Sequence, residues 1–300
     1  MADQPHARAT HRTTVRRVAG RAAVALETTL LAHGVPRAEG ATLGGELEQI
    51  VRDAGGRPAT IGVLRGTPVV GLSADELAEF LAEPEITKAN PANLGVACAR
   101  GGMAATTAGA TIQLAAAAGI RVVATGGLGG VHPDLAQRLD VSADLAALAR
   151  YPVAVACSGV KGLLDVASTR ELLETLGVPV VGYRTDAFPA FYLRDGAAGV
   201  DARFDDVAGL AGFVRRSLAE TGRGVLVAQP APESHAIDPA AWNDWLAQAR
   251  ERAASATGRD VTPSILAALH EISGGSTLRA NLALVRANAR LGGELAAAMA

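Results

Sequence analysis

Residues 153–183 read VAVACSGVKGLLDVASTRELLETLGVPVVGY and contain one strand–helix–strand unit. The apolar run Val153–Cys157 is typical of a buried strand, and Val178–Gly182 is a second run of this kind. Gly162–Leu176 between them has the composition of a helix. Because the same alternation continues in both directions along the chain, we expect a mostly parallel sheet covered by helices.

Short β-branched runs and alanine-rich stretches extend this pattern. The other expected strands are Val24–Leu26, Thr60–Leu64, Pro68–Leu72, Arg121–Ala124 and Val225–Ala228, the second and third forming a hairpin. The other expected helices are Ala41–Ala54, Ala74–Leu81, Thr107–Ala118, Ala143–Arg150 and Asp206–Glu220. Residues 241–300 are expected to be nearly all helical, with breaks at Gly258 and at Gly274-Gly275. No linker divides the chain, so we predict a single α/β domain over residues 21–300 with a helical C-terminal region.

Composition excludes several classes of function. The net charge of −2 argues against a nucleic-acid-binding surface, although the first 21 residues hold five arginines against one aspartate. We interpret residues 1–20 as a disordered, basic tail. No apolar run reaches the length of about 18 residues that a membrane helix needs. Cys98 and Cys157 show neither metal-site spacing nor a disulfide framework, so a cytoplasmic location is expected.

Ligands of open parallel sheets bind beyond the carboxyl ends of the strands. Four polar segments follow expected strands: Glu27–Thr29, Thr125–Gly127, Ser158–Lys161 and Tyr183–Thr185. We therefore expect all four to open onto one cleft.

Lys161 is a candidate nucleophile because it follows an apolar strand through a turn of small residues. Desolvation there favours the neutral amine, which can attack a carbonyl to give a Schiff base. The chain has only two lysines, Lys88 and Lys161, among 28 Lys and Arg residues, and arginine cannot replace an amine nucleophile. A surface lysine that opens a helix is the alternative.

Glu27 directly follows an apolar run, where partial burial would raise the pKa of its carboxyl and suit it to general acid catalysis. A solvated strand end is the alternative. The glycine-rich segment from Thr125 to His132 could cradle an anion with its backbone amides, or form a plain turn. His132 by itself is more often structural than catalytic.

Asp140 and Asp144 lie four residues apart at an expected helix start. Ser142 and the amides that follow could bind phosphate at the positive end of the helix dipole. Asp140 could hold a divalent ion through water. Ordinary helix capping is the alternative.

Taken together, these motifs resemble the pseudouridine-5'-phosphate glycosidase family, also called the indigoidine synthase A-like family. The matching stretches are ALETTLLAHG (25–34), PATIG (58–62), ATT (105–107), RVVATGGLGGVH (121–132), DVSADL (140–145), KGLLD (161–165), VPVVGY (178–183), FPAF (188–191) and GGSTLRANL (274–282). They follow the family order from about residue 20 to residue 295.

The resemblance implies a homotrimeric enzyme that opens the sugar ring. Glu27 would donate a proton to the ring oxygen, Lys161 would form an imine with C1 of ribose, and Asp140 would bind Mn²⁺. The implied contacts to sugar phosphate are Lys88, Ala108, Ser142, Ala143 and Asp144. Asn281, Thr125 and His132 would lie near the aglycone or the ring.

Several positions depart from the family pattern. Gly162 stands where serine is usual, Pro133 where arginine is usual, and Gln229 where asparagine is usual. These departures favour synthesis of a C–C bond between ribose 5-phosphate and a non-uracil aromatic acceptor, as in C-ribosylating enzymes of the alnumycin type. Cleavage of pseudouridine 5'-phosphate to uracil and ribose 5-phosphate is the alternative. A third hypothesis, a sugar-phosphate-binding scaffold without activity, is disfavoured by the presence of Lys161, Glu27 and Asp140.

Overall fold

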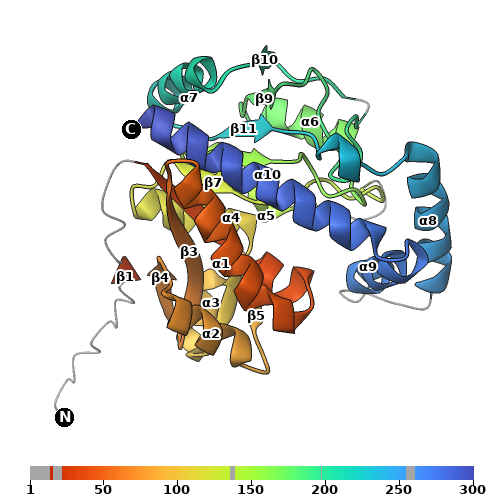
Figure 1. Cartoon of the computed structure of the whole chain (residues 1–300), viewed down its shortest axis with the longest axis horizontal. Coiled ribbons are helices and arrows are strands. Elements are labelled where there is room, and N and C mark those ends of the chain that lie inside the picture. Colours follow the sequence, from red (N-terminus) through yellow and green to blue (C-terminus); the bar gives the residue numbers. More distant parts are fainter. Residues whose placement is uncertain (1–13, 16–21, 136–138, 197, 255–260) are drawn as a thin grey trace, which may run out of the picture.

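A central sheet organises the computed structural model, which describes residues 14–15, 22–135, 139–196, 198–254 and 261–300 (Figure 1). The strands are β1 (Thr14–Val15), β2 (Ala23–Glu27), β3 (Arg57–Leu64), β4 (Thr67–Val70), β5 (Thr87–Ala89), β6 (Ala104–Thr106), β7 (Val122–Ala124), β8 (Ala154–Cys157), β9 (Val180–Tyr183), β10 (Ala202–Phe204) and β11 (Val225–Ala228). Their spatial order is β1-β4-β3-β2-β7-β8-β11-β9-β10, with β6 beside β3 and β5 beside β6.

The sheet is mostly parallel, as the sequence predicts. Only β3 pairs in antiparallel fashion among the described strands, with β4 on one side and β6 on the other. The predicted hairpin is confirmed, because Leu64 pairs with Thr67 and Val63 with Pro68 across the two-residue turn. Arg65 in that turn has a φ of 47° and Gly66 a φ of 78°, as hairpin turns of this length require.

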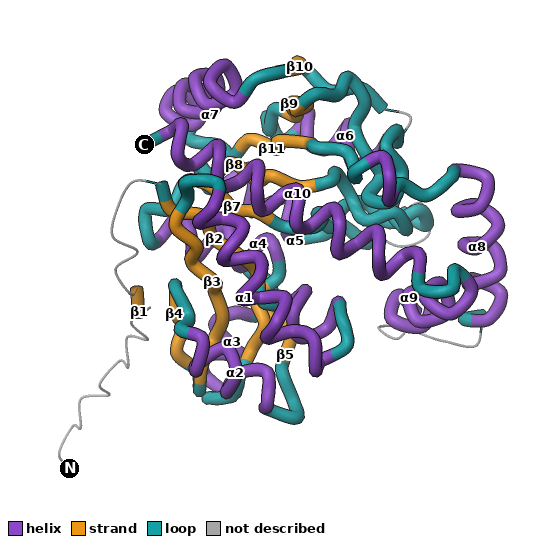
Figure 2. Tube along the Cα trace, viewed as in Figure 1, coloured by secondary structure: helices purple, strands orange, loops and turns teal. Residues whose placement is uncertain are grey.

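Helices cover both faces of the sheet, which confirms the α/β fold (Figures 1 and 2). They are α1 (Arg37–Asp53), α2 (Ala74–Ala82), α3 (Leu94–Arg100), α4 (Ala108–Ala117), α5 (Ala143–Arg150), α6 (Val166–Thr175), α7 (Val207–Thr221), α8 (Pro239–Arg252), α9 (Val261–Ile272) and α10 (Ser276–Met299), with short turns η1 (Leu30–Gly34) and η2 (Glu233–His235). The alternation of β2 shows the two layers: Val24 and Leu26 face the core under α1, α7 and α10, whereas Ala23 and Ala25 face the core under α3 to α6.

Small residues let α10 lie close to the sheet, which it crosses beside α1 (Figure 1). A Cβ atom on Gly292 would lie 3.0 Å from the Cβ of Ala124 and 3.3 Å from Val24. Ala154 and Ala156 of β8 are fully buried and belong to the same core cluster. Aromatic residues make up only 3% of the chain, and small side chains instead allow α10 to pack closely against the sheet.

Two predicted helix boundaries are wrong, and each has a local cause. α1 begins at Arg37 rather than residue 41, directly after Pro36, whose ring restricts the backbone before the helix. α6 begins at Val166 rather than Gly162, because Asp165 accepts a hydrogen bond from Ser168 N at 2.9 Å and caps the helix there. Residues 161–165 are left as a turn.

The C-terminal region is helical, as expected, and breaks at Gly274-Gly275, where both glycines have positive φ. The break predicted at Gly258 and most of the predicted N-terminal tail lie outside the described residues. The structure describes Thr14–Val15 of that segment as a strand paired with β4. Among the described helices, none is long and apolar enough to cross a membrane.

Candidate active site

Three of the four predicted polar segments meet at the carboxyl ends of neighbouring strands. Glu27 ends β2, Thr125 follows β7, and Ser158 follows β8, and these three strands are adjacent in the sheet. The fourth segment, Tyr183–Thr185, follows β9, and β11 lies between β9 and β8. That this segment opens onto the same cleft stays a prediction.

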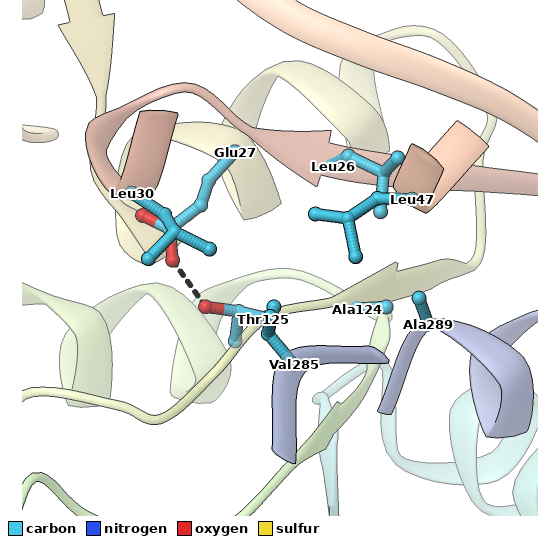
Figure 3. A pocket seen from close by; sticks show the side chains of 8 residues that line it. All are labelled: Leu26, Glu27, Leu30, Leu47, Ala124, Thr125, Val285 and Ala289. Carbon is cyan, nitrogen blue, oxygen red and sulfur yellow. Dashed lines mark hydrogen bonds between the residues drawn. The ribbon is translucent and has the colours of Figure 1, made fainter. Parts of the chain in front are cut away.

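Glu27 is half-buried, and its carboxyl accepts a hydrogen bond from the hydroxyl of Thr125 (Figure 3). Behind it lies a cavity of about 10 Å³, lined by Leu26, Glu27, Leu30, Leu47, Ala124, Thr125, Val285 and Ala289. This cavity is too small for a sugar phosphate. Burial raises the pKa of Glu27, while Lys161 and the Thr125 hydrogen bond oppose the rise. The sequence predicted this direction.

Two amines and a second carboxylate complete a cluster of interacting charges around Glu27. Lys161, Lys88 and Asp144 all influence the pKa of Glu27 electrostatically. The pKa of Lys88 is lowered by partial desolvation and by the positive charge of Lys161, against the pull of Glu27 and Asp144. Residues from β2, β5, α5 and the turn after β8 thus converge on one place.

Lys161 itself is exposed, which differs from the desolvated position that its strand context suggests. Its backbone is nevertheless fixed by the glycine-rich segment: Lys161 N donates to Leu128 O at 3.0 Å, and Leu128 N donates to Gly159 O at 2.9 Å. Gly159 has a φ of 72°, and a Cβ there would lie 1.9 Å from the carbonyl oxygen of Pro189. Only glycine therefore fits this turn, which delivers Lys161 to the site.

Asp144 is buried and holds two segments in place with one carboxylate. Its Oδ1 accepts a hydrogen bond from Gly109 N at 2.7 Å, and its Oδ2 accepts one from Gly129 N at 2.9 Å. A Cβ on Gly129 would lie 2.2 Å from Ser142 Oγ, so the glycine-rich segment can approach α5 only without a side chain there. The carboxylate predicted to contact sugar phosphate therefore already has two protein partners.

The N-termini of two helices border this arrangement. Ala108 is the first residue of α4, and Ala143 is the first residue of α5. Ser142 caps α5 by accepting a hydrogen bond from Asp144 N at 3.2 Å. Because α5 is tied through Asp144 to Gly109 of α4, the positive ends of both helix dipoles lie at the same side of the site.

His132 and Asp140 lie at the base of a loop whose ends are paired. His132 N donates to Asp140 O at 3.0 Å, and Ser142 N donates to Gly130 O at 3.0 Å. Asp140 is half-buried. Throughout the parts of the chain that the structure describes, no three His, Cys, Asp or Glu side chains group closely enough to hold a metal ion. A cation at Asp140 would therefore take most of its ligands from water, which suits a hard divalent cation.

Two asparagines of α10 face the same strand ends. Asn281 is 7% exposed, and its Oδ1 has no hydrogen-bond partner within the described part of the chain. A Cβ on Gly126 would lie 3.5 Å from that oxygen. Asn288, which the sequence analysis missed, is fully buried and donates to Thr125 O at 2.9 Å. Its spacing of two helical turns from Asn281 is the signal that places both on one face.

A family model described as indigoidine synthase A like protein matches residues 14–298. The pseudouridine-5'-phosphate glycosidase of Symbiobacterium thermophilum is 46% identical over 286 residues, which cover 93% of this chain and 93% of the relative. The enzyme of the same name from Salinispora tropica is 46% identical over 287 residues, covering 94% and 88% of the two chains.

Two solved structures share the fold over nearly the whole chain. The prealnumycin C-glycosynthase AlnA in complex with ribulose 5-phosphate has a TM-score of 0.88 at 35% identity, covering 96% of each chain. An indigoidine synthase A (IdgA)-like protein from Thermotoga maritima has a TM-score of 0.86 at 37% identity, covering 98% of each chain.

The fold and the site define an α/β enzyme that presents a half-buried acid and an exposed amine at the carboxyl ends of neighbouring parallel strands. Relatives that match over nearly the whole chain are named pseudouridine-5'-phosphate glycosidases, and one of the solved structures of this fold is that of a C-glycosynthase. The chain belongs to the indigoidine synthase A-like family.

Proposed function

We propose that this enzyme cleaves the C–C glycosidic bond of pseudouridine 5'-phosphate and releases uracil and ribose 5-phosphate. The observation that carries the proposal is the electrostatic coupling of Glu27, with its raised pKa, to the amine of Lys161. A C–C glycosidic bond has no leaving-group oxygen to protonate, so two carboxylates alone do not suit its hydrolysis. An amine provides the missing electron sink, because it can form an iminium at C1.

The proposed reaction begins with Glu27, which gives its proton to the ring oxygen as the bond from that oxygen to C1 breaks. Lys161, as the free amine, forms a bond to C1 through Nζ and returns a proton to Glu27. Glu27 then protonates the base carbon, and the bond between C1 and that carbon breaks: its electrons restore the double bond of the base, while nitrogen and C1 form an iminium. Water hydrolyses the iminium, so that ribose 5-phosphate leaves and Lys161 is regenerated.

The phosphate would bind where the N-termini of α4 and α5 meet. The amides of Ala108 and Ala143, the hydroxyl of Ser142 and the ammonium of Lys88 are the groups that suit it. Asp144 would act mainly by holding these groups together, since its carboxylate already accepts two backbone hydrogen bonds. The complex of the related AlnA contains a pentulose 5-phosphate, which supports this class of ligand.

The aglycone would lie toward α10. The buried Oδ1 of Asn281 has no partner in the described part of the chain, and leaving such an acceptor unpaired is costly. An N–H group of a planar base would satisfy it, with Thr125 and His132 nearer the sugar.

We also propose that Asp140 binds Mn²⁺ through one carboxylate and several waters. The ion would neutralise charge near the phosphate.

Incubation with pseudouridine 5'-phosphate and Mn²⁺, followed by chromatography, tests the proposal. We expect uracil and ribose 5-phosphate in equal amounts. Binding of the nucleotide without turnover would contradict the proposal and favour the inactive scaffold.

Synthesis on a different aromatic acceptor is the second candidate, and one contact favours it. A Cβ on Gly162 would lie 3.0 Å from the ring of Trp242, so the residue after Lys161 is covered by an aromatic wall. The glycosidase is nevertheless better supported, since the relatives of that name are 46% identical and the C-glycosynthase is 35% identical. Failure to cleave the nucleotide, together with coupling of ribose 5-phosphate to a phenolic acceptor, would reverse this preference.

A further inference from the structure

Asn288 of α10 binds the ends of two strands that carry the proposed catalytic groups. Its Nδ2 lies 2.9 Å from Thr125 O, 3.2 Å from Gly126 O and 3.1 Å from Ser158 Oγ. The side chain is fully buried, as is that of Ser158. One amide group therefore contacts the chain directly after β7 and directly after β8.

The two chain segments that Asn288 contacts both lead to proposed catalytic groups. Thr125 holds Glu27 through its hydroxyl, while its backbone carbonyl is held by Asn288. Ser158 N donates to Gly126 O at 2.9 Å, and the same two segments continue in register until Lys161 N donates to Leu128 O. Asn288 therefore contacts both the residue that holds Glu27 and the start of the turn that carries Lys161.

We propose that Asn288 is a positioning residue, which sets the Thr125 hydroxyl against Glu27 and keeps the turn to Lys161 in register with the glycine-rich segment. This inference rests on the roles proposed above for Glu27 and Lys161. Asn288 touches neither substrate nor reacting atoms in this scheme. It acts through Thr125 and Ser158.

The chemistry of the contact requires an amide. Two backbone carbonyls and the hydroxyl of Ser158 converge on Nδ2, and the same hydroxyl lies 3.5 Å from Oδ1. A carboxylate here would face two carbonyl oxygens without a counter-charge, and an apolar side chain would leave both carbonyls without this donor. The short side chain also matches the close approach of α10 to the sheet.

The inference can be tested without turnover, by following the titration of Glu27 itself. Protein labelled with ¹³C in the glutamate carboxyl is titrated by NMR, and the Glu27 signal is assigned with Glu27→Gln. Lys161, Lys88 and Asp144 face the carboxyl, and Thr125 donates to it. Since the Thr125 hydrogen bond favours the ionised carboxyl, its loss in Thr125→Val should move the midpoint upward.

The variant Asn288→Ala should move the Glu27 midpoint in the same direction. In the double variant with Thr125→Val, the removal of Asn288 should add no further shift, because its effect passes through the Thr125 hydroxyl. The matched control is Leu295→Ala, which truncates a fully buried side chain of the same helix away from these contacts. It should destabilise the protein and leave the midpoint where it is.

An unchanged midpoint in Asn288→Ala, or additive shifts in the double variant, would overturn the inference. If the alanine variant does not fold, Asn288→Ser keeps one donor and carries the same test. Failure of both to fold, with Leu295→Ala folded, would show that Asn288 determines the fold and not the alignment.

With pseudouridine 5'-phosphate, kcat of Asn288→Ala should fall about 10- to 100-fold while KM changes little, as expected for misplaced reacting groups. If the wild type does not cleave this nucleotide, the proposed function fails, while the titration still decides on Asn288.

Discussion

The carboxylate of Asp144 accepts a hydrogen bond of 2.7 Å from the backbone amide of Gly109, thirty-five residues earlier in the chain. Its second oxygen accepts from Gly129. One buried side chain of α5 therefore fixes the first turn of α4 and the glycine-rich segment after β7. The proposed phosphate site depends on this contact, because it brings two helix N-termini together.

Replacing Asp144 by asparagine should affect both stability and substrate binding. Asparagine can accept from one of the two amides, but its NH₂ group would face the other donor. Because hydrogen bonds to charged groups are worth about 1.5–3 kcal/mol, we expect the free energy of unfolding to fall by about that amount. KM for pseudouridine 5'-phosphate should rise. Urea unfolding and steady-state kinetics measure the two effects.

The matched control is Asp206→Ala, which removes the exposed cap of α7 on a different part of the protein. It should cost about 0.5–2 kcal/mol of stability and leave KM unchanged. Equal effects of both variants on KM would show that Asp144 is only a stabilising residue.

Glu27→Gln should stabilise the protein in a manner that depends on pH. The pKa of Glu27 is raised above its ordinary value of 4.5, so the folded state binds this proton more tightly than the unfolded state. The free energy of unfolding therefore falls as pH rises from 4.5 to the raised pKa of Glu27, and it falls no further above that pKa. Glutamine removes the loss, so the melting temperature of the variant should exceed that of the wild type increasingly as pH rises. A pH-independent difference for Glu27→Gln would argue against burial of the charge.

Lys161→Ala should lower turnover by at least about 10³-fold, as expected for loss of a nucleophile. Borohydride added with ribose 5-phosphate should trap a covalent adduct on the wild type and not on this variant. Lys161→Arg is the matched control, because it keeps the positive charge and cannot form the imine. Intact-protein mass spectrometry reads the result. An adduct that persists in the Lys161 variants, or that forms first on Lys88, would assign the nucleophile elsewhere.

Lys88→Met should weaken binding of the phosphate more than it slows the chemical step. A charge-assisted contact contributes about 1.5–3 kcal/mol, so KM should rise about tenfold or more. Lys88→Arg keeps the charge and should lose much less. Comparing pseudouridine 5'-phosphate with the unphosphorylated nucleoside isolates the effect, since the nucleoside should be insensitive to both changes. A similar loss with both substrates would remove Lys88 from the phosphate site.

Chelation tests the proposed role of Asp140. EDTA should lower activity reversibly, Mn²⁺ should restore it, and Asp140→Asn should lose the response. The protein should remain folded without metal, because a single carboxylate among waters contributes little to the fold. Circular dichroism before and after chelation checks this point. Full activity after exhaustive chelation, verified by elemental analysis, would show that this enzyme needs no metal.

Local signals predicted the fold well wherever they were strong. The pattern Ser73-Ala74-Asp75-Glu76 predicts a capping box before the helix, and Ser73 and Glu76 form one at the start of α2. The short strands β5 and β6 were missed, because neither has the apolar β-branched run that marks β7 and their pairing depends on distant partners. The start of α6 was misjudged because the cap formed by Asp165 outweighs the helical composition after Lys161.

The site was predictable in its residue types and not in its arrangement. Glu27 and Thr125 lie 98 positions apart, and only the sheet order brings their side chains into contact. Burial of Glu27 follows from its place after an apolar run, which the sequence does show. The contacts of Asn288 could not be predicted, because its partners lie 130 to 163 residues earlier in the chain.

The position of β11 has a consequence for synthesis of the chain on the ribosome. β11 (Val225–Ala228) enters the sheet between β8 and β9, which are made earlier. Until it emerges from the exit tunnel, β8 has an unpaired edge that can join other nascent chains. The last helix then supplies Asn281 and Asn288, so a polypeptide stalled before residue 276 has neither. Prematurely terminated products of this gene should therefore be inactive and prone to aggregation.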